Sequence, residues 1–238
     1  MKIASFQPTF LPYPGYFGLI DYVDKFIIMD NVQFAARGWQ QRVLIKNNKV
    51  PKFLTLPIIK KKLRSQLILD AKIDSSSNYI NSHLLTIKHS YSRYPYFDKF
   101  YPEIEKIYKK NNNKLIDLNL SFIFLIVKFL KLNEKKFIKL SEMQIDKEFS
   151  KDNLIHEICL NLKSTKEYIA TEGAKIYLKD NKKLNSDFVV KYFKYKFDNN
   201  SLMHYNQKQC HLSTIDLIFS YGEKAREIIR SNFCIIDE

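Results

Sequence analysis

The chain has 238 residues, of which 45% are hydrophobic and 27% are charged, an ordinary balance for a globular protein that can bury a sizeable core. Its formal charge of +14 would suit an anionic partner, but only six of its 39 basic residues are Arg. Because Arg supplies the planar fork that pairs with phosphates and base edges, this composition favours a nucleotide-like small molecule over specific nucleic-acid binding.

The cysteine pattern and the apolar runs predict a cytoplasmic protein. The chain has three widely spaced cysteines, Cys159, Cys210 and Cys234, and their spacing indicates neither a metal-binding knuckle nor a disulfide framework. This pattern is typical of a protein in the reducing cytoplasm. The apolar run near the N-terminus is too short for a signal peptide. The most apolar segment, residues 118–130, is broken by polar residues and falls short of the roughly 20 apolar residues that a membrane helix needs.

The first thirty residues predict a strand, a loop, a helix and a second strand. Residues 2–6 form a short apolar run, and the three prolines within residues 7–15 predict a stiff, extended loop. Residues 16–22 predict a short helix, and residues 25–29 a second buried strand. This order is a βαβ unit, which implies a parallel pair of strands with a right-handed crossover.

The rest of the chain alternates between shorter strands and helices. Residues 47–49 predict a polar turn and residues 60–62 a solvated loop. Further strands are predicted at residues 42–45, 52–57, 66–73, 167–170 and 188–197. Helices are predicted at residues 79–91, 97–109, 115–132, 152–162, 213–221 and 223–231. We therefore predict an α/β fold, a single domain over residues 1–238 with an N-terminal βαβ-type mixed sheet and a helical insert around residues 78–132.

The loop that begins at Gln7 is the first candidate site. A loop that leaves a strand and enters a helix lies at the carboxyl edge of a sheet, where α/β proteins bind ligands. The start of the helix also presents unpaired N–H groups that suit a phosphate. No dinucleotide or Walker-type glycine motif is present, so the alternative of a merely connecting loop stays open.

A cluster of polar and aromatic side chains follows the second predicted strand. Asp30 stands at the strand end, where a carboxylate can act as a base, a hydroxyl acceptor or a metal ligand. Arg37 and Arg42 could clamp a phosphate or carboxylate beside the single Trp, Trp39, which offers a stacking face. Each residue alone has an ordinary structural explanation, but their density, together with Gln33, favours a site.

Two later motifs are weaker. His83 and His89 are six residues apart, which places them on different faces of a helix and argues against a zinc pair, although His83 could be a general acid or base. Ser213 and Asp216 fit an N-cap and the third helical position, a complete structural explanation. No metal site is predicted, and no cofactor is identifiable.

These motifs, in this order, resemble the WbqC-like family of bacterial O-antigen and other surface-polysaccharide gene clusters, and the likeness covers essentially the whole chain. The N-terminal residues that carry it are Gln7-Pro8-Thr9-Phe10-Leu11-Pro12, Gly15-Tyr16-Phe17, Asp30-Asn31-Val32-Gln33-Phe34 and Gly38-Trp39-Gln40-Gln41-Arg42. The later ones are His83, Tyr91, Pro95-Tyr96-Phe97, Tyr205, Gln207, Leu212-Ser213-Thr214-Ile215-Asp216-Leu217 and Gly222. The family usually has His before the Gln-Pro pair, where this chain has Phe6.

The resemblance implies a cytoplasmic transferase of surface-polysaccharide biosynthesis, which passes an acyl or aminoacyl group to a nucleotide-linked aminosugar. Catalytic roles are then expected for Asp30 and His83. The residues expected to contact the small-molecule substrate are Gln7, Gln33, Arg37, Trp39, Arg42, Tyr91, Tyr205, Gln207 and Asp216.

Other functions remain open at this stage. The order of elements is also similar to the nucleotidyltransferase-like group that includes pantothenate synthetase, which would imply ATP use, although the His-x-Gly-His signature is absent. The charge of +14 admits a nucleic-acid-binding module that holds an aminoacyl-tRNA. A non-catalytic accessory protein of the same gene cluster is the third alternative.

Overall fold

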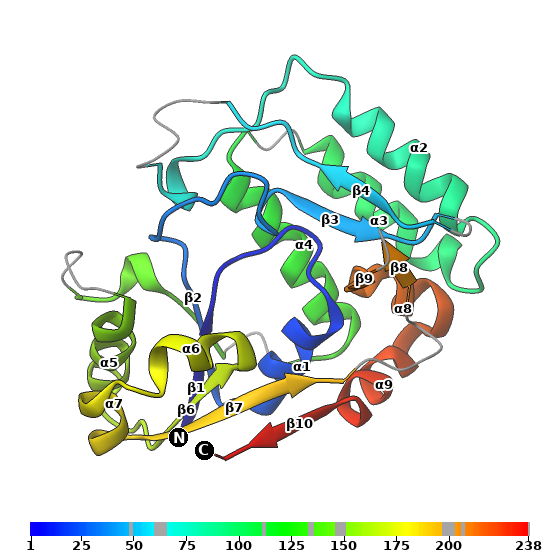
Figure 1. The fold of residues 1–238 in the computed structure, drawn as a ribbon. Coiled ribbons are helices and arrows are strands. Elements are labelled where there is room, and N and C mark those ends of the chain that lie inside the picture. The colour runs from blue at the N-terminus through cyan, green and yellow to red at the C-terminus, as the bar shows by residue number, and fades with distance from the viewer. Residues whose placement is uncertain are drawn as a thin grey trace.

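The computed structural model describes residues 1–47, 50–59, 66–110, 113–132, 136–145, 151–196, 203–205 and 208–237. Its centre is a six-stranded sheet with helices on both faces, so the α/β prediction is confirmed (Figure 1). The strand order is β10-β7-β6-β1-β2-β5. The strands are β1 (Lys2–Phe6), β2 (Lys25–Ile28), β5 (Phe137–Lys139), β6 (Glu167–Thr171), β7 (Val189–Tyr195) and β10 (Phe233–Ile236).

Pairing within the sheet is parallel except at one edge. β1 pairs in parallel with β2 and with β6, β6 with β7, and β2 with β5, whereas β10 runs antiparallel to β7. The βαβ prediction is confirmed, because Ile3 lies opposite Lys25 in a parallel pair joined by helix α1 (Pro14–Tyr22). Chain order reverses at β1, since the strand next in sequence lies on one side of it and β6 lies on the other.

Alternating side chains of the sheet face two cores, as the pleat of a strand requires. Ala4 and Phe26 join the larger core, which contains residues of α1, α4 (Leu115–Phe129) and α9 (Ala225–Ser231). Ile3 and Ile27 join the second core, with α5 (Lys151–Asn161), α6 (Lys175–Leu178) and α7 (Lys182–Asp187). Both faces are therefore covered, and the strands read as continuous apolar runs.

The segment between β2 and β5 builds a layer beside the carboxyl ends of the strands (Figure 1). Strands β3 (Arg42–Ile45) and β4 (Lys52–Thr55) form an antiparallel hairpin, and α2 (Tyr79–Tyr91), α3 (Phe97–Lys109) and α4 follow it. Near the C-terminus the chain forms the hairpin β8 (Met203–Tyr205) and β9 (Lys208–Cys210), then α8 (Thr214–Tyr221).

The structure corrects several predicted elements. The strand predicted at residues 66–73 is wrong, because this segment holds only isolated bridges and the 3₁₀ turn η1 (Ile68–Asp70). The helix predicted at residues 115–132 ends at Phe129, just before Lys131 takes a positive φ of 55°. The predicted loops at residues 48–49 and 60–62 lie outside the described residues. No helix among the described residues is long and apolar enough to span a membrane.

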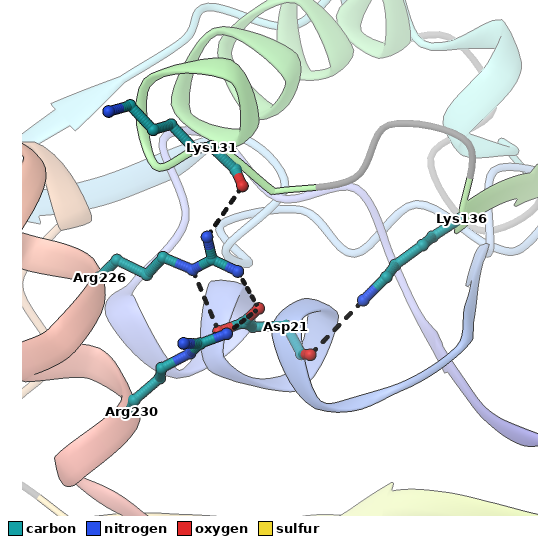
Figure 2. A network of polar contacts seen from close by, with 5 residues as sticks. All are labelled: Asp21, Lys131, Lys136, Arg226 and Arg230. Carbon is teal, nitrogen blue, oxygen red and sulfur yellow. Dashed lines mark hydrogen bonds and ion pairs between the residues drawn. The ribbon is translucent and has the colours of Figure 1, made fainter.

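A buried carboxylate fastens α1 to α9 (Figure 2). Asp21, whose side chain is 7% exposed, accepts hydrogen bonds from Arg226 Nη2 at 2.8 Å and from the guanidinium of Arg230. Arg226 also donates to the carbonyl oxygen of Lys131 at 3.0 Å, and Lys136 Nζ donates to the carbonyl oxygen of Asp21. Three segments far apart in sequence therefore meet at one end of α1.

Candidate functional site

Two cavities adjoin at the carboxyl ends of β1 and β6. Cavity A, of about 390 Å³, is lined by residues that include Thr9, Tyr13, Trp39, Glu172, Lys194 and His211. Cavity B, of about 490 Å³, is lined by residues that include Gln7, Val32, Gln33, Leu154, Tyr168 and Tyr177. Phe6, Thr171 and Gly173 line both, so the two cavities share one boundary.

The topology explains why the crevice forms there. After β1 the chain turns to the face covered by α1, whereas after β6 it turns to the face covered by α6. The two connections therefore leave adjacent parallel strands in opposite directions and open a gap between them. In open α/β sheets such a switch point is where ligands bind.

The loop over residues 7–13, which covers one side of the crevice, is held by buried hydrogen bonds. Asn119, fully buried in α4, donates from Nδ2 to the carbonyl oxygens of Pro8 at 3.0 Å and Gln40 at 2.8 Å. The backbone N–H of Phe10 donates to the carbonyl oxygen of Trp39 at 2.9 Å. These bonds fix the loop against the segment that carries Trp39, so two walls of cavity A are joined to each other.

The start of α8 holds the other end of this loop. Ser213 caps the helix, as predicted, by accepting from the backbone N–H of Ile215, and its hydroxyl donates to the carbonyl oxygen of Leu11 at 2.8 Å. Thr214 donates to the carbonyl oxygen of Pro12 from both its hydroxyl and its backbone N–H. Leu11 has a left-handed φ of 43°, a strained conformation that these bonds help to maintain.

Neutral aromatic and imidazole groups line cavity A. The ring of Tyr13 meets the ring of His211 edge-on at 4.9 Å and that of Tyr195 at 6.1 Å. Burial lowers the pKa of His211, so its imidazole is neutral at pH 7. Burial also raises the pKa of Tyr13 to about 12, which keeps its phenol protonated. A neutral imidazole beside a phenol is a suitable proton acceptor for a bound ligand.

Charged and polar groups complete this cavity. Lys194 Nζ lies 2.7 Å from Glu172 Oε1, and both side chains remain about half exposed. Thr9 is 7% exposed, and its hydroxyl oxygen is buried with no hydrogen-bond partner among the described residues. Trp39 is 49% exposed, so a stacking face is open to solvent at the cavity wall.

Cavity B has a different character. Its floor holds Ser5 and Tyr168, whose hydroxyls are hydrogen-bonded to each other at 2.8 Å. Gln7 accepts a short hydrogen bond from Gln40, which orients its amide at the boundary of the cavity. Its walls combine apolar side chains with the polar groups of Gln33 and Thr171, and no charged side chain occurs among the described residues that line it.

The structure places the two predicted catalytic residues away from this crevice. Asp30 is fully buried beyond β2, and its carboxylate accepts from the backbone N–H and the hydroxyl of Ser141 at 2.9 and 2.6 Å. His83 is 5% exposed in α2, where Nδ1 lies 3.1 Å from the hydroxyl of Tyr108. Burial lowers the pKa of His83 to about 4. Neither lines cavity A or B, and their catalytic roles remain predictions.

Three of the predicted binding residues line the crevice, Gln7 and Gln33 in cavity B and Trp39 in cavity A. Arg37 is exposed in the same turn as Trp39, with a φ of 61° and its backbone N–H bonded to Gln41. The guanidinium of Arg42 stacks over the ring of Phe53 at 4.6 Å.

The remaining predicted residues lie elsewhere or cannot be placed. Tyr91 is fully buried; its hydroxyl accepts from the backbone N–H of Lys46 at 2.9 Å and contacts the carboxylate of Asp216. Burial raises the pKa of Asp216, which is 8% exposed. Tyr205 belongs to β8, and Gln207 lies outside the described residues.

Several polar residues of cavity A were not among the predicted site residues. Glu172 follows β6 and Lys194 lies in β7, in segments that carry no motif, and only the pairing of these strands in the sheet brings the two residues near β1. His211 immediately precedes the Leu-Ser-Thr motif, which is hydrogen-bonded to the loop over residues 7–13. Its position beside this motif was the one sequence feature that could have identified it as a site residue. Tyr13 stood within the Pro-rich loop itself. Among the described residues no cluster of His, Cys, Asp or Glu resembles a metal site.

The fold and the crevice define a doubly wound α/β protein with two adjoining cavities at the switch point of the sheet. Within that class the chain belongs to the WbqC-like protein family, which it matches over residues 7–228. It is also similar to the uncharacterized protein Rv1507c of Mycobacterium tuberculosis (strain ATCC 25618 / H37Rv), with 25% identity over 230 residues that cover 96% of this chain and 97% of that protein. No solved structure matches the chain.

Proposed function

We propose that the protein is a cytoplasmic transferase of O-antigen-like surface-polysaccharide biosynthesis, which joins an acyl or aminoacyl group to the amine of a nucleotide-linked aminosugar. The observation that carries the proposal is the crevice of two adjoining cavities at the switch point of the sheet, one with charged side chains in its lining and one with none among the described residues that line it. A transferase must bring two substrates together, and two cavities with a shared boundary supply that arrangement. The resemblance to a family of polysaccharide gene clusters supports the substrate class.

Cavity A is the proposed site of the aminosugar end of the nucleotide sugar. Trp39 offers its open face for stacking against the sugar or the base. Lys194, which also pairs with Glu172, and the exposed Arg37 are the proposed partners of the diphosphate, and the buried hydroxyl of Thr9 is the proposed partner of a sugar hydroxyl. The two cationic side chains agree with the positive net charge of the chain.

The proposed reaction forms an amide. The sugar nitrogen attacks the carbonyl carbon of an activated acyl ester or thioester and forms the C–N bond. The bond from that carbon to the oxygen or sulfur of the carrier then breaks with its electron pair. His211 takes the proton that the nitrogen loses and returns it to the departing alkoxide or thiolate. A positioned base of this kind typically gives roughly 10²–10⁴-fold.

Trp39 allows a direct test, because it is the single Trp of the chain and its fluorescence reports on cavity A alone. Nucleotide-linked 3-amino and 4-amino sugars are titrated against the purified protein, and each is then incubated with ester and thioester acyl donors while the product is followed by mass spectrometry. We expect at least one sugar to quench the fluorescence of Trp39 in a saturable manner. The mass of the same sugar should increase by that of one acyl group.

Two variants separate binding from chemistry. His211→Phe keeps the aromatic packing against Tyr13, so it should bind the sugar within about three-fold of the wild type but lose amide formation by roughly 10²–10⁴-fold. Lys194→Met should weaken binding of the nucleotide sugar. A panel that is neither bound nor acylated would overturn the proposal. An unchanged surface-glycan mass in cells that carry His211→Phe would favour the non-catalytic alternative.

A further inference from the structure

We propose that cavity B holds the acyl group of the donor and accepts an uncharged, largely apolar one. This inference rests on the proposed function. It adds the chemical class of the acyl group that the donor substrate carries. The two cavities differ in charge, since Glu172, Lys194 and His211 line cavity A, whereas the described lining of cavity B carries no charged side chain. A group that is buried without a charged partner must itself be uncharged.

The walls of cavity B define the shape of its ligand. Val32, Leu154 and Tyr177 supply apolar surface from three different segments of the chain. The hydroxyls at its floor, those of Ser5 and Tyr168, are bonded to each other, so the deep end requires no polar ligand atom. Burial raises the pKa of Tyr168, which keeps this pair neutral. An aliphatic chain can therefore lie against the floor.

The boundary with cavity A is formed by Phe6, Thr171 and Gly173, which line both cavities. Gln7 stands at the end of β1, and its amide is oriented by Gln40. Gly173 stands at the end of β6, and the space above its Cα is open, with no atom within 4 Å of where a Cβ would lie. The carbonyl of a bound acyl group would reach this boundary and face an amine held in cavity A.

The test uses N-phenyl-1-naphthylamine, an uncharged probe whose fluorescence rises in an apolar cavity, with the full-length protein. Ala35 is exposed at the rim of cavity B, and the neighbouring Ala36 is equally exposed but does not line it. Ala35→Trp should raise the dissociation constant of the probe by about ten-fold or more, and the matched variant Ala36→Trp should leave it unchanged. Tyr177→Ser, at a half-exposed position, should also weaken binding of the probe.

Competition identifies the ligand class. S-butyryl-N-acetylcysteamine, an uncharged acyl thioester, should displace the probe, whereas uridine diphosphate should not. Equal probe affinity in the wild type and in both the Ala35 and Tyr177 variants would overturn the inference, as would displacement by uridine diphosphate. Failure of the proposed function gives a different pattern, in which the thioester competes as expected but no aminosugar quenches Trp39 or gains an acyl mass.

Discussion

The side-chain amide of Asn119 donates a hydrogen bond of 3.0 Å to the carbonyl oxygen of Pro8, across 111 positions of the sequence. The same Nδ2 also donates to the carbonyl oxygen of Gln40 at 2.8 Å. A single buried amide in α4 thus joins the loop after β1 to the segment that carries Trp39. The walls of cavity A depend on this residue, although it lies outside the cavity.

The first prediction concerns the stability that Asn119 supplies. Asn119→Leu removes the donor and leaves two buried carbonyl oxygens unpaired, which should lower the free energy of unfolding by about 2 kcal/mol. Urea denaturation measures this change. The control is Asn81→Ala, since Asn81 is exposed on α2 and should change stability by less than about 0.5 kcal/mol. Equal changes in the free energy of unfolding for the two substitutions would show that the hydrogen bonds of the buried Asn119 amide do not stabilise the protein.

The second prediction is a pH dependence of stability from His83. Burial lowers its pKa in the folded protein to about 4, whereas the unfolded chain takes up the proton near pH 6.5. His83 therefore contributes its full stability above about pH 6.5, and roughly 3 kcal/mol is lost as the pH falls to about 4. We expect His83→Phe to remove this part of the pH profile, measured by denaturation at several pH values.

His89 provides the matched control for that experiment, because it lies on the same helix but is exposed. His89→Phe should retain the pH profile of the wild type. A profile that is the same in the His83 variant and the wild type would mean that His83 is already accessible to protons in the folded state.

The third prediction concerns the carboxylate of Asp21. Burial acts to raise its pKa, but the hydrogen bonds and charges of Arg230 and Arg226 outweigh burial and lower it. A lowered pKa contributes stability above the unfolded value near 4, and that stability is lost as the pH falls through the folded value. Asp21→Asn should cost about 1 kcal/mol at pH 7, because both Arg side chains are partly exposed, and the deficit should shrink at acidic pH.

Calorimetry of the Asp21 variant at pH 7 and pH 3 tests this expectation. Asp180→Asn is a suitable control, since Asp180 is an exposed aspartate. A loss of stability that is the same at the two pH values would contradict the ion-pair explanation, because the loss would then not depend on the charge of Asp21.

The fourth prediction uses the contrast between two glycines. Gly173 faces open space between the two cavities, so Gly173→Leu should fold with stability within about 0.5 kcal/mol of the wild type while it blocks the shared boundary and abolishes transfer. Gly222 has a φ of 58°, and a Cβ there would lie 2.4 Å from the ring of Tyr96. Gly222→Ala should therefore destabilise the protein by more than about 1 kcal/mol. Thermal unfolding and product mass distinguish the two effects.

Local periodicity was sufficient to predict most of the fold. The helices over residues 79–91 and 97–109 have the predicted bounds, because their apolar spacing is strong and turn residues follow each. The strand predicted at residues 66–73 is wrong because this apolar run has no continuous partner strand and forms only isolated bridges to three different segments. β5 and β10 were missed, since three or four residues at the edge of a sheet carry too little pattern to identify a strand alone.

The candidate site could be predicted only in part, for a topological reason. Gln7 and Trp39 belong to one continuous segment, so local clustering was enough to single them out. His211 and Lys194 reach the cavity of Trp39 from later parts of the chain, through strand pairings and bridges between distant segments that no single segment encodes. Asp30 also stands at a strand end, but its carboxylate is bonded to Ser141, a partner that its position in the sequence does not reveal.

The position of β1 also has a consequence for the synthesis of the protein on the ribosome. β1 occupies residues 2–6, but its neighbour β6 occupies residues 167–171 and β2 gains its outer neighbour only at residues 137–139. At typical translation speeds of about 5–20 residues per second, β1 waits on the order of ten seconds or more for its second neighbour, β6. Nascent chains therefore expose an unpaired apolar edge for most of their elongation, and a chaperone that shields such edges should raise the yield of folded protein.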